Sequence, residues 1–373
     1  MAAVSVQDNL TTEVRTSELQ DIEEKVHAGE RLSFEDGMRL YHADLRAVGA
    51  LANIVRERKN GNNAYFVRNQ HINYTNICNK FCKFCSFYAL PRDENAYSLT
   101  PEQIQARVRQ HLDLHVQEIH MVAGINPRLP YSYYLDILRA VKEVRPDVHI
   151  RAFTMVEIAH IVRISRKPFE ECLNELKAAG LDSLPGGGAE IFSQRVHDEL
   201  FRQKQNGDQW LDLVKRCHRA GLRSNATMLY GHIETVEEKV DHLVRLREAQ
   251  DETGGFMTYI PLLFHPERTE LLHIPIANGD QRLREIAVGR LMLDNFNHVK
   301  AFWMMITPAV AQTALWYGAD DIDGTIVDYE ITLADGDDIP NRMTRDGLIQ
   351  LIQDVNRTPV ERDSEYRPRV VVN

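Results

Sequence analysis

Short apolar runs alternate with amphipathic helical stretches along most of this chain. Runs of the length and composition of buried strands lie at residues 64–77, 118–124, 148–154, 181–185, 223–230, 255–262, 298–304 and 322–327. Between them, apolar residues recur with a helical period at residues 100–114, 131–144, 168–179, 208–220, 235–250 and 280–295. This alternation predicts an α/β fold with a parallel sheet, and about eight repeats favour a closed (β/α)8 barrel of the TIM type over an open doubly wound sheet.

The two ends of the chain follow other patterns. From Ser17 to Arg58 the pattern is helical, with Ser33 as a helix N-cap, and the run Gly61-Asn62-Asn63 ends it. The last 45 or so residues are rich in Asp, Arg and Pro and predict one helix near residues 348–355. We therefore expect an N-terminal helical extension packed on the barrel (1–60), the barrel itself (61–328) and a C-terminal extension (329–373).

Charge and composition narrow the class of protein. The formal net charge is -10, with 54 acidic and 44 basic side chains, and no basic block offers a track for a phosphate backbone. No apolar run approaches the roughly 20 residues that span a bilayer, and residues 1–13 do not resemble a signal peptide. Of five cysteines, three share one loop, which is typical of reduced intracellular thiols. We expect a cytoplasmic protein with a small-molecule substrate and without nucleic-acid or membrane partners.

The three clustered cysteines are the strongest chemical feature. Cys78, Cys82 and Cys85 have the spacing CxxxCxxC, with Phe84 just before the last of them, where an apolar run turns into a loop. Three thiolates can hold three irons of a [4Fe–4S] cluster and leave the fourth iron open to a ligand. The alternatives are a zinc site completed by His71 and a redox pair made of Cys82 and Cys85.

Other candidate residues follow the predicted strands, where barrel enzymes collect their active-site groups. Gly124 follows the second strand and would let backbone approach a ligand closely. Gly186–Gly188 and then Glu190 follow the fourth strand. Three glycines in a row indicate positive φ or close packing, and Glu190 could bind a ligand or simply favour a helix start. After the fifth strand, Gly231 and Glu234 form a GxxE ending.

Cationic side chains near the later strands could meet an anionic substrate at the barrel mouth. These are His265, Arg268, His298 and Lys300. Any one of them, taken alone, is equally compatible with a structural or solvated role.

Taken together, these segments resemble the radical SAM superfamily, and within it the menaquinone-biosynthesis branch, most closely the aminofutalosine synthases. The resemblance extends from the cysteine loop and Ser86 through the triple glycine and Tyr230-Gly231-His232-Ile233-Glu234 to the run Gly318-Ala319-Asp320-Asp321-Ile322-Asp323-Gly324-Thr325. It implies a [4Fe–4S] cluster on Cys78, Cys82 and Cys85, and S-adenosylmethionine (SAM) as cosubstrate. It also implies SAM contacts from Phe84, Gly124, Glu190 and Glu234.

The resemblance further implies an activity. The 5′-deoxyadenosyl radical from SAM would add to the vinyl carbon of 3-[(1-carboxyvinyl)oxy]benzoate, and rearrangement with loss of a carboxyl group would give 6-amino-6-deoxyfutalosine. An electron donor such as flavodoxin or ferredoxin would reduce the cluster. Arg68, His232, His265 and Arg268 are candidates to bind the two substrate carboxylates. Two sibling groups, the cyclic dehypoxanthine futalosine synthases and the deazaflavin-precursor synthases, which begin by hydrogen abstraction, are the alternative.

Overall fold

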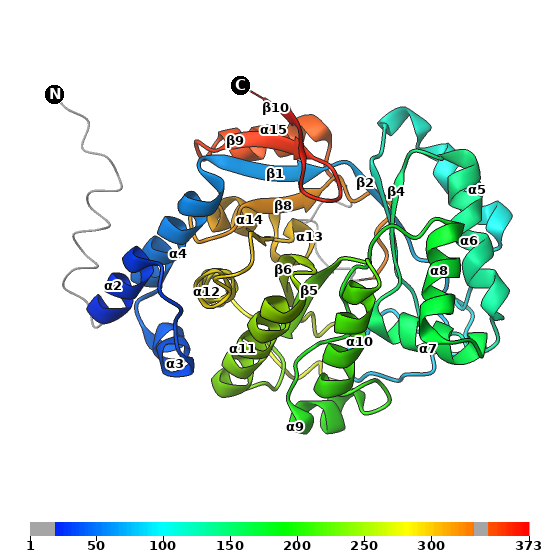
Figure 1. Ribbon diagram of the computed structural model, residues 1–373, viewed down its shortest axis with the longest axis horizontal. Coiled ribbons are helices and arrows are strands. Elements are labelled where there is room, and N and C mark those ends of the chain that lie inside the picture. The colour runs from blue at the N-terminus through cyan, green and yellow to red at the C-terminus, as the bar shows by residue number, and fades with distance from the viewer. Residues whose placement is uncertain (1–18, 332–341, 373) are drawn as a thin grey trace.

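The computed structural model describes residues 19–331 and 342–372, and its centre is a barrel of parallel strands (Figure 1). The barrel strands are β1 Asn63–Val67, β2 Asn69–Ile72, β3 Glu118–Met121, β4 His149–Ala152, β5 Ser224–Tyr230, β6 Phe256–Leu263, β7 His298–Val299 and β8 Asp321–Gly324. Strands β1 and β2 are successive halves of the first barrel strand. β2 pairs with β3 and β3 with β4, β5 pairs with β6 and β6 with β7, and β8 pairs with β1.

The fourth barrel position is held by single bridges instead of a full strand. Ser183 bridges Arg151 of β4, and Leu184 bridges Ser224 of β5. A further bridge, between Lys300 and Asp321, links β7 to β8, so the ring is continuous. The predicted (β/α)8 barrel is confirmed, although most strands are shorter than the apolar runs because the ends of those runs leave the ladder as loops around the site.

Helices cover the outside of the barrel and begin with strong caps. They are α5 Pro101–Gln110, α6 Tyr131–Val144, α7 Met155–Ser165, α8 Phe169–Ala179, α9 Gln194–Val196, α10 Gly207–Arg219, α11 Val236–Thr253, α12 Gly279–Met292, α13 Trp303–Ile306 and α14 Pro308–Ala314, with a 3-10 turn η1 Leu112–Leu114 and a π turn η2 His197–Phe201. Reciprocal capping boxes start α5, α7, α10, α11 and α12. Because each box satisfies two backbone N–H groups that the helix cannot, it fixes where the helix begins after its strand.

Three N-terminal helices pack on one side of the barrel, on the left in Figure 1. They are α2 Gln20–Ala28, α3 Phe34–His42 and α4 Leu45–Asn60. Ser33 caps α3 as expected, and α4 ends at Gly61. The Tyr41 hydroxyl donates to the buried Glu285 carboxylate of α12 at 2.7 Å, which ties this helical extension to the barrel wall.

The C-terminal segment contributes more than the single expected helix. Besides α15 Arg345–Gln353 it contains β9 Thr358–Arg362 and β10 Pro368–Val371. β9 pairs in parallel with β1 along the edge that β3 leaves free, and β10 pairs antiparallel with β9. Arg362 of β9 is fully buried and donates to Asp321 of β8 at 2.6 Å, so this segment is tied to the barrel strands.

Charged pairs fill much of the barrel interior, where apolar branched residues are usual. Arg151 faces Glu118 at 3.3 Å, and Lys300 faces Asp323 at 3.0 Å. A buried charge is tolerable when it is paired and hydrogen-bonded, so these pairs keep a polar interior compatible with folding.

Across the described ranges, no helix has the length and apolar character needed to cross a membrane. The expectation about the N-terminal residues 1–13 falls outside the described part of the chain.

Candidate active site

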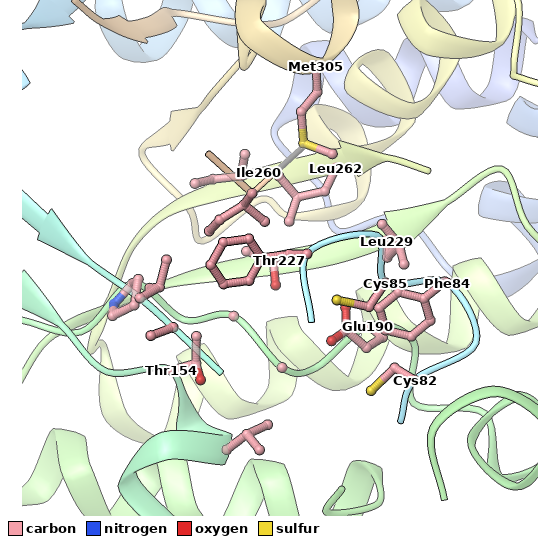
Figure 2. Close-up of a pocket in the computed structure, with 18 of the residues that line it drawn as sticks. Cys82, Phe84, Cys85, Thr154, Glu190, Thr227, Leu229, Ile260, Leu262 and Met305 are labelled. Carbon is pink, nitrogen blue, oxygen red and sulfur yellow. The ribbon is translucent and has the colours of Figure 1, made fainter. Parts of the chain in front are cut away.

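A cavity of about 310 Å³ opens at the carboxyl ends of the barrel strands, and all three cysteines of the CxxxCxxC loop line it. Figure 2 shows Cys82, Phe84 and Cys85 beside Glu190 at one end of this space. The loop follows β2, and the backbone hydrogen bonds that hold it include those from Cys78 N–H to the Ala89 carbonyl at 3.2 Å and from Cys85 N–H to the Cys82 carbonyl at 3.1 Å. The Phe84 ring packs edge to face against Phe201 at 5.9 Å.

The chemistry of this loop fits an iron–sulfur cluster. The three thiols are free, and burial raises the pKa of Cys82 to about 12 and also raises that of Cys85. Thiols in this state are protonated at neutral pH, so metal binding would displace their protons. Across the described ranges, no three Cys, His, Asp or Glu side chains converge as ligands of a single metal ion. Three thiolates can hold three irons of a [4Fe–4S] cluster, whereas a structural zinc ion is usually held by four ligands.

Gly124 packs closely against the cysteine loop. A Cβ at this position would lie 2.9 Å from the carbonyl carbon of Ile77 and 3.0 Å from Cβ of Cys78. The glycine therefore lets the segment that follows β3 pack directly against the cysteine loop. It also lines the cavity, so its backbone faces both the loop and any ligand.

The triple glycine follows the fourth barrel position and packs under α7 and β5. Gly186 and Gly188 have positive φ, and a Cβ on Gly186 would overlap the carbonyl of Asn225. Glu190, which follows them, also has a left-handed backbone (φ 49) and lines the cavity. A non-glycine residue held in this region is strained, and such strain collects at functional sites.

Lys204 was missed by the sequence reasoning because it lies in a polar segment that continues neither a strand nor a helix. Its ammonium group lies within the cavity lining, forms an ion pair with Glu190, and sits 5.0 Å from the centre of the Phe84 ring. Burial lowers the pKa of Lys204, but the nearby Cys82 and Glu190 outweigh it and raise the pKa above its usual value. The cysteine end of the cavity thus carries one fixed anion and one fixed cation.

Glu157 was also not predicted as a site residue. Its hydrogen bonds stabilise the backbone that forms one wall of the cavity. It accepts hydrogen bonds from the Tyr74 hydroxyl at 2.5 Å, the Thr154 N–H at 2.8 Å and the Ala123 N–H at 3.2 Å. Burial raises the pKa of Glu157 to about 7. The carboxylate joins the ends of three barrel strands and so positions the backbone next to Gly124.

The far wall of the cavity is apolar. Figure 2 shows Ile260, Leu262 and Met305 together on the side away from Cys82 and Glu190. An apolar wall suits an aromatic ligand or part of one.

Comparison with known proteins places this geometry in a family. The model of the radical SAM superfamily matches residues 72–246, and that of the CofH/MqnC C-terminal region matches residues 253–373. The aminodeoxyfutalosine synthase of Thermus thermophilus is 45% identical over 95% of this chain and 96% of that protein. The chain belongs to the radical SAM superfamily. The Streptomyces coelicolor aminodeoxyfutalosine synthase is 42% identical over 93% of each chain, and the cyclic dehypoxanthine futalosine synthase of Halalkalibacterium halodurans is 35% identical over 93% of this chain and 94% of that one.

Solved structures of radical SAM proteins share the fold. Methylornithine synthase superposes with a TM-score of 0.72 over 90% of this chain and 96% of its own, at 18% identity. The hydrogenase maturase HydG of Carboxydothermus hydrogenoformans gives 0.74 over 97% of this chain and 87% of its own, at 16% identity. Membership of the radical SAM superfamily implies a [4Fe–4S] cluster and SAM as cosubstrate, and the loop at Cys78, Cys82 and Cys85 has the donor set for that cluster.

Glu234, one of the expected SAM contacts, is not among the residues that line the cavity of this radical SAM protein. It accepts hydrogen bonds from the N–H groups of Gly231 at 2.6 Å and His232 at 2.8 Å, and its carboxylate lies 3.0 Å from His232 Nδ1. Burial raises the pKa of Glu234, but His232 and the Gly231 N–H together lower it to about 2. These contacts give it a loop-bracing role, and its contact with SAM stays a prediction.

The structure also shows which of the cationic side chains expected to bind the substrate carboxylates line the cavity. Of Arg68, His232, His265 and Arg268, only His265 lines the cavity. Arg68 is bound to Glu361 at 2.7 Å.

The other two candidates for binding an anionic substrate, His298 and Lys300, also differ in whether they line the cavity. His298 is bound to Asp320 at 2.6 Å and lies outside the cavity lining, whereas Lys300 lines it.

Proposed function

We propose that this chain is an aminodeoxyfutalosine synthase, which joins the 5′-deoxyadenosyl group of SAM to 3-[(1-carboxyvinyl)oxy]benzoate. With water, the two substrates give 6-amino-6-deoxyfutalosine, methionine and bicarbonate, a step of menaquinone biosynthesis. The identities to two such synthases, 45% and 42%, exceed those to two cyclic dehypoxanthine futalosine synthases, 35% and 34%, over similar lengths.

The observation that carries the proposal is the make-up of the cavity at the cysteine loop. One end of the cavity is lined by the cysteine loop together with Glu190 and Lys204. The opposite wall, formed by Ile260, Leu262 and Met305, is apolar. An aryl substrate packed on that wall lies next to SAM bound at the cysteine end. Such proximity is what a bond-forming step between two substrates requires.

When bound, the cluster supplies the electron that cleaves SAM into methionine and a 5′-deoxyadenosyl radical. The chain's own residues orient the reactants. The methionine part of SAM carries an ammonium and a carboxylate, and Glu190 and Lys204 offer it one group of each opposite charge. The Ala123–Gly124 backbone, fixed by Glu157, forms the adjoining wall. Apolar side chains at the other wall exclude water from the reacting carbon.

An electron donor of the flavodoxin or ferredoxin kind completes this proposal, since the cluster needs an external reductant. We expect the enzyme to work in the cytoplasm, where such donors and reduced thiols occur together.

The test is an anaerobic turnover of cluster-reconstituted protein with SAM, dithionite and 3-[(1-carboxyvinyl)oxy]benzoate, with products measured by mass spectrometry. The expected product is the adenosyl adduct that has lost one carboxyl group. If 5′-deoxyadenosine is the sole adenosyl product, the substrate assignment is wrong and a sibling reaction that begins by hydrogen abstraction takes its place. A Cys82→Ala variant gives the background without the cluster.

A further inference from the structure

The inner end of the cavity holds a group of polar side chains that neither the cluster nor SAM accounts for. His71 of β2 and His120 of β3 are register partners, and their rings stack with centroids 4.6 Å apart. Lys300 and Asp323 line the same cavity and face each other at 3.0 Å. His71 lies within its strand, whereas Cys78 lies six residues past the end of β2, so this group sits deeper in the barrel than the cysteine loop.

His71 is the anomaly in this group. Only 4% of the residue is exposed, and neither ring nitrogen has a hydrogen-bond partner among the described residues. Burial, followed by the charge of His120, lowers the pKa of His71 to about 3, so the ring is neutral and offers one N–H donor. Leaving a buried donor and acceptor unpaired is unfavourable, which indicates a polar partner that binds here.

Lys300 supplies a positive charge at this end of the cavity. Within the part of the chain that the structure describes, its ammonium group donates to Asp323 alone, which leaves two N–H donors for a ligand. Asp323 is already satisfied on its other oxygen by Asn69 at 3.0 Å. A ligand at this point would therefore be an acceptor, and an anion gains most because it can take charge-assisted hydrogen bonds.

Aromatic rings border the same point. Tyr329 meets His71 edge to face at 5.3 Å and Phe302 at 5.8 Å, and both Tyr329 and Phe302 line the cavity. An anion bound by Lys300 would thus be attached to a flat apolar group lying between these rings and the apolar wall.

We propose that His71, His120 and Lys300 form the subsite for the carboxylate on the aromatic ring of the substrate. This inference rests on the proposed function. The vinyl carbon must lie next to SAM at the cysteine end, so the benzoate carboxylate, at the opposite end of the substrate, reaches inward to this group. Of the other cations considered, Arg68, Arg268, His232 and His298 do not line the cavity. His265 does line it, but its Nε2 is already hydrogen-bonded to the Met305 carbonyl at 2.9 Å.

The test compares two ligands on each variant, without turnover. Calorimetric titrations of cluster-loaded, SAM-bound protein, kept anaerobic and without reductant, measure the Kd of 3-[(1-carboxyvinyl)oxy]benzoate and of its benzamide analogue, which lacks only the ring carboxylate. Removing one partner of a desolvated charge pair weakens binding by about 100-fold. Wild type should therefore prefer the acid by about that factor, and Lys300→Met should weaken the acid by about 100-fold and the amide by less than about 3-fold.

A second variant covers the case in which Lys300→Met leaves Asp323 uncompensated and does not fold. His71→Phe keeps the stacking on His120 and breaks no existing hydrogen bond, and should weaken the acid by about 10-fold with little effect on the amide. Lys215→Met is the matched control, because Lys215 is a partly exposed lysine paired with Glu252 outside the cavity, and it should change neither Kd.

The outcomes separate the two proposals. Equal loss of acid and amide in both variants, or no loss in either, overturns the subsite. Failure of wild type to form the adenosyl adduct with the acid overturns the proposed function instead, whatever the titrations give.

Discussion

Replacing Gly124 with alanine tests whether the segment that follows β3 must touch the cysteine loop. The new Cβ would lie 2.9 Å from the Ile77 carbonyl carbon and 3.0 Å from Cys78 Cβ, and closer still to the Ile77 carbonyl oxygen. Ordinary contact begins near 3.4 Å, so the loop must move by about half an ångström or more. The loop cannot move freely, because Asn79 N–H is bonded to the Ile125 carbonyl and Gly124 N–H to the Thr75 carbonyl.

Overpacking of this kind lowers the free energy of unfolding by about 1–3 kcal/mol, and here the strain falls on the residue that carries a cluster ligand. We expect Gly124→Ala to lose about 2 kcal/mol in urea unfolding of the metal-free protein. After anaerobic reconstitution, iron per chain should fall to about half of the wild-type content or less, with a matching loss of the cluster absorbance.

Gly279→Ala is the matched control. Gly279 begins α12 and a Cβ there meets nothing within 4 Å, so the same added methyl group should leave iron content unchanged. If Gly124→Ala binds as much iron as this control and cleaves SAM at the wild-type rate, the close approach is not required and the reasoning fails.

Three further substitutions have defined outcomes. Cys82→Ala should abolish SAM cleavage and lower iron content, while Cys217→Ala, buried in α10, should preserve both; iron loss in the second variant would mean that the ligand set is wrong. The pKa of Glu234, lowered to about 2 by its histidine and backbone partners against the effect of burial, predicts stability that is present above pH 4.5 and lost as pH falls toward 2. Wild type should therefore lose about 3 kcal/mol relative to Glu234→Gln over that interval in acid unfolding, and parallel curves would refute it. Gly186→Ala adds a Cβ that overlaps a backbone carbonyl of β5 and should cost about 3 kcal/mol or more in chemical unfolding. Gly254→Ala, which also has positive φ but open space around it, should cost only about 1 kcal/mol, and equal losses would show that φ alone matters.

The barrel was predictable from sequence because period and spacing are local properties. The segment at residues 131–144 is amphipathic with clear ends, and its helix α6 has those same bounds. Helix α7, Met155–Ser165, was not predicted, since its apolar residues continue almost without interruption after the strand and give no separate helical face. The strands β9 and β10 are mixed in polarity, and β9 pairs with β1, which lies far away in sequence, while β10 pairs with β9.

The candidate site was predictable where a motif concentrates chemistry in a few residues. Cys78, Cys82 and Cys85 share one loop, so their spacing is readable directly. Lys204 was not found in this way, and His71 was considered only as a zinc ligand, because their proposed roles depend on partners in distant segments, Glu190 in one case and His120 in the other. Only the structure shows that the two ring nitrogens of His71 have no hydrogen-bond partner among the described residues.

The pairing of β1 with β9 has a consequence for how the chain is made. Asn63 is the register partner of Thr358, so the first strand to leave the ribosome waits for one of the last before its edge is covered. Until then the nascent barrel exposes an unpaired strand edge, a known route to aggregation. Loss of β9 would leave that edge open permanently. Tags or truncations at the carboxyl terminus should therefore disturb expression yield more than comparable changes in the N-terminal helices.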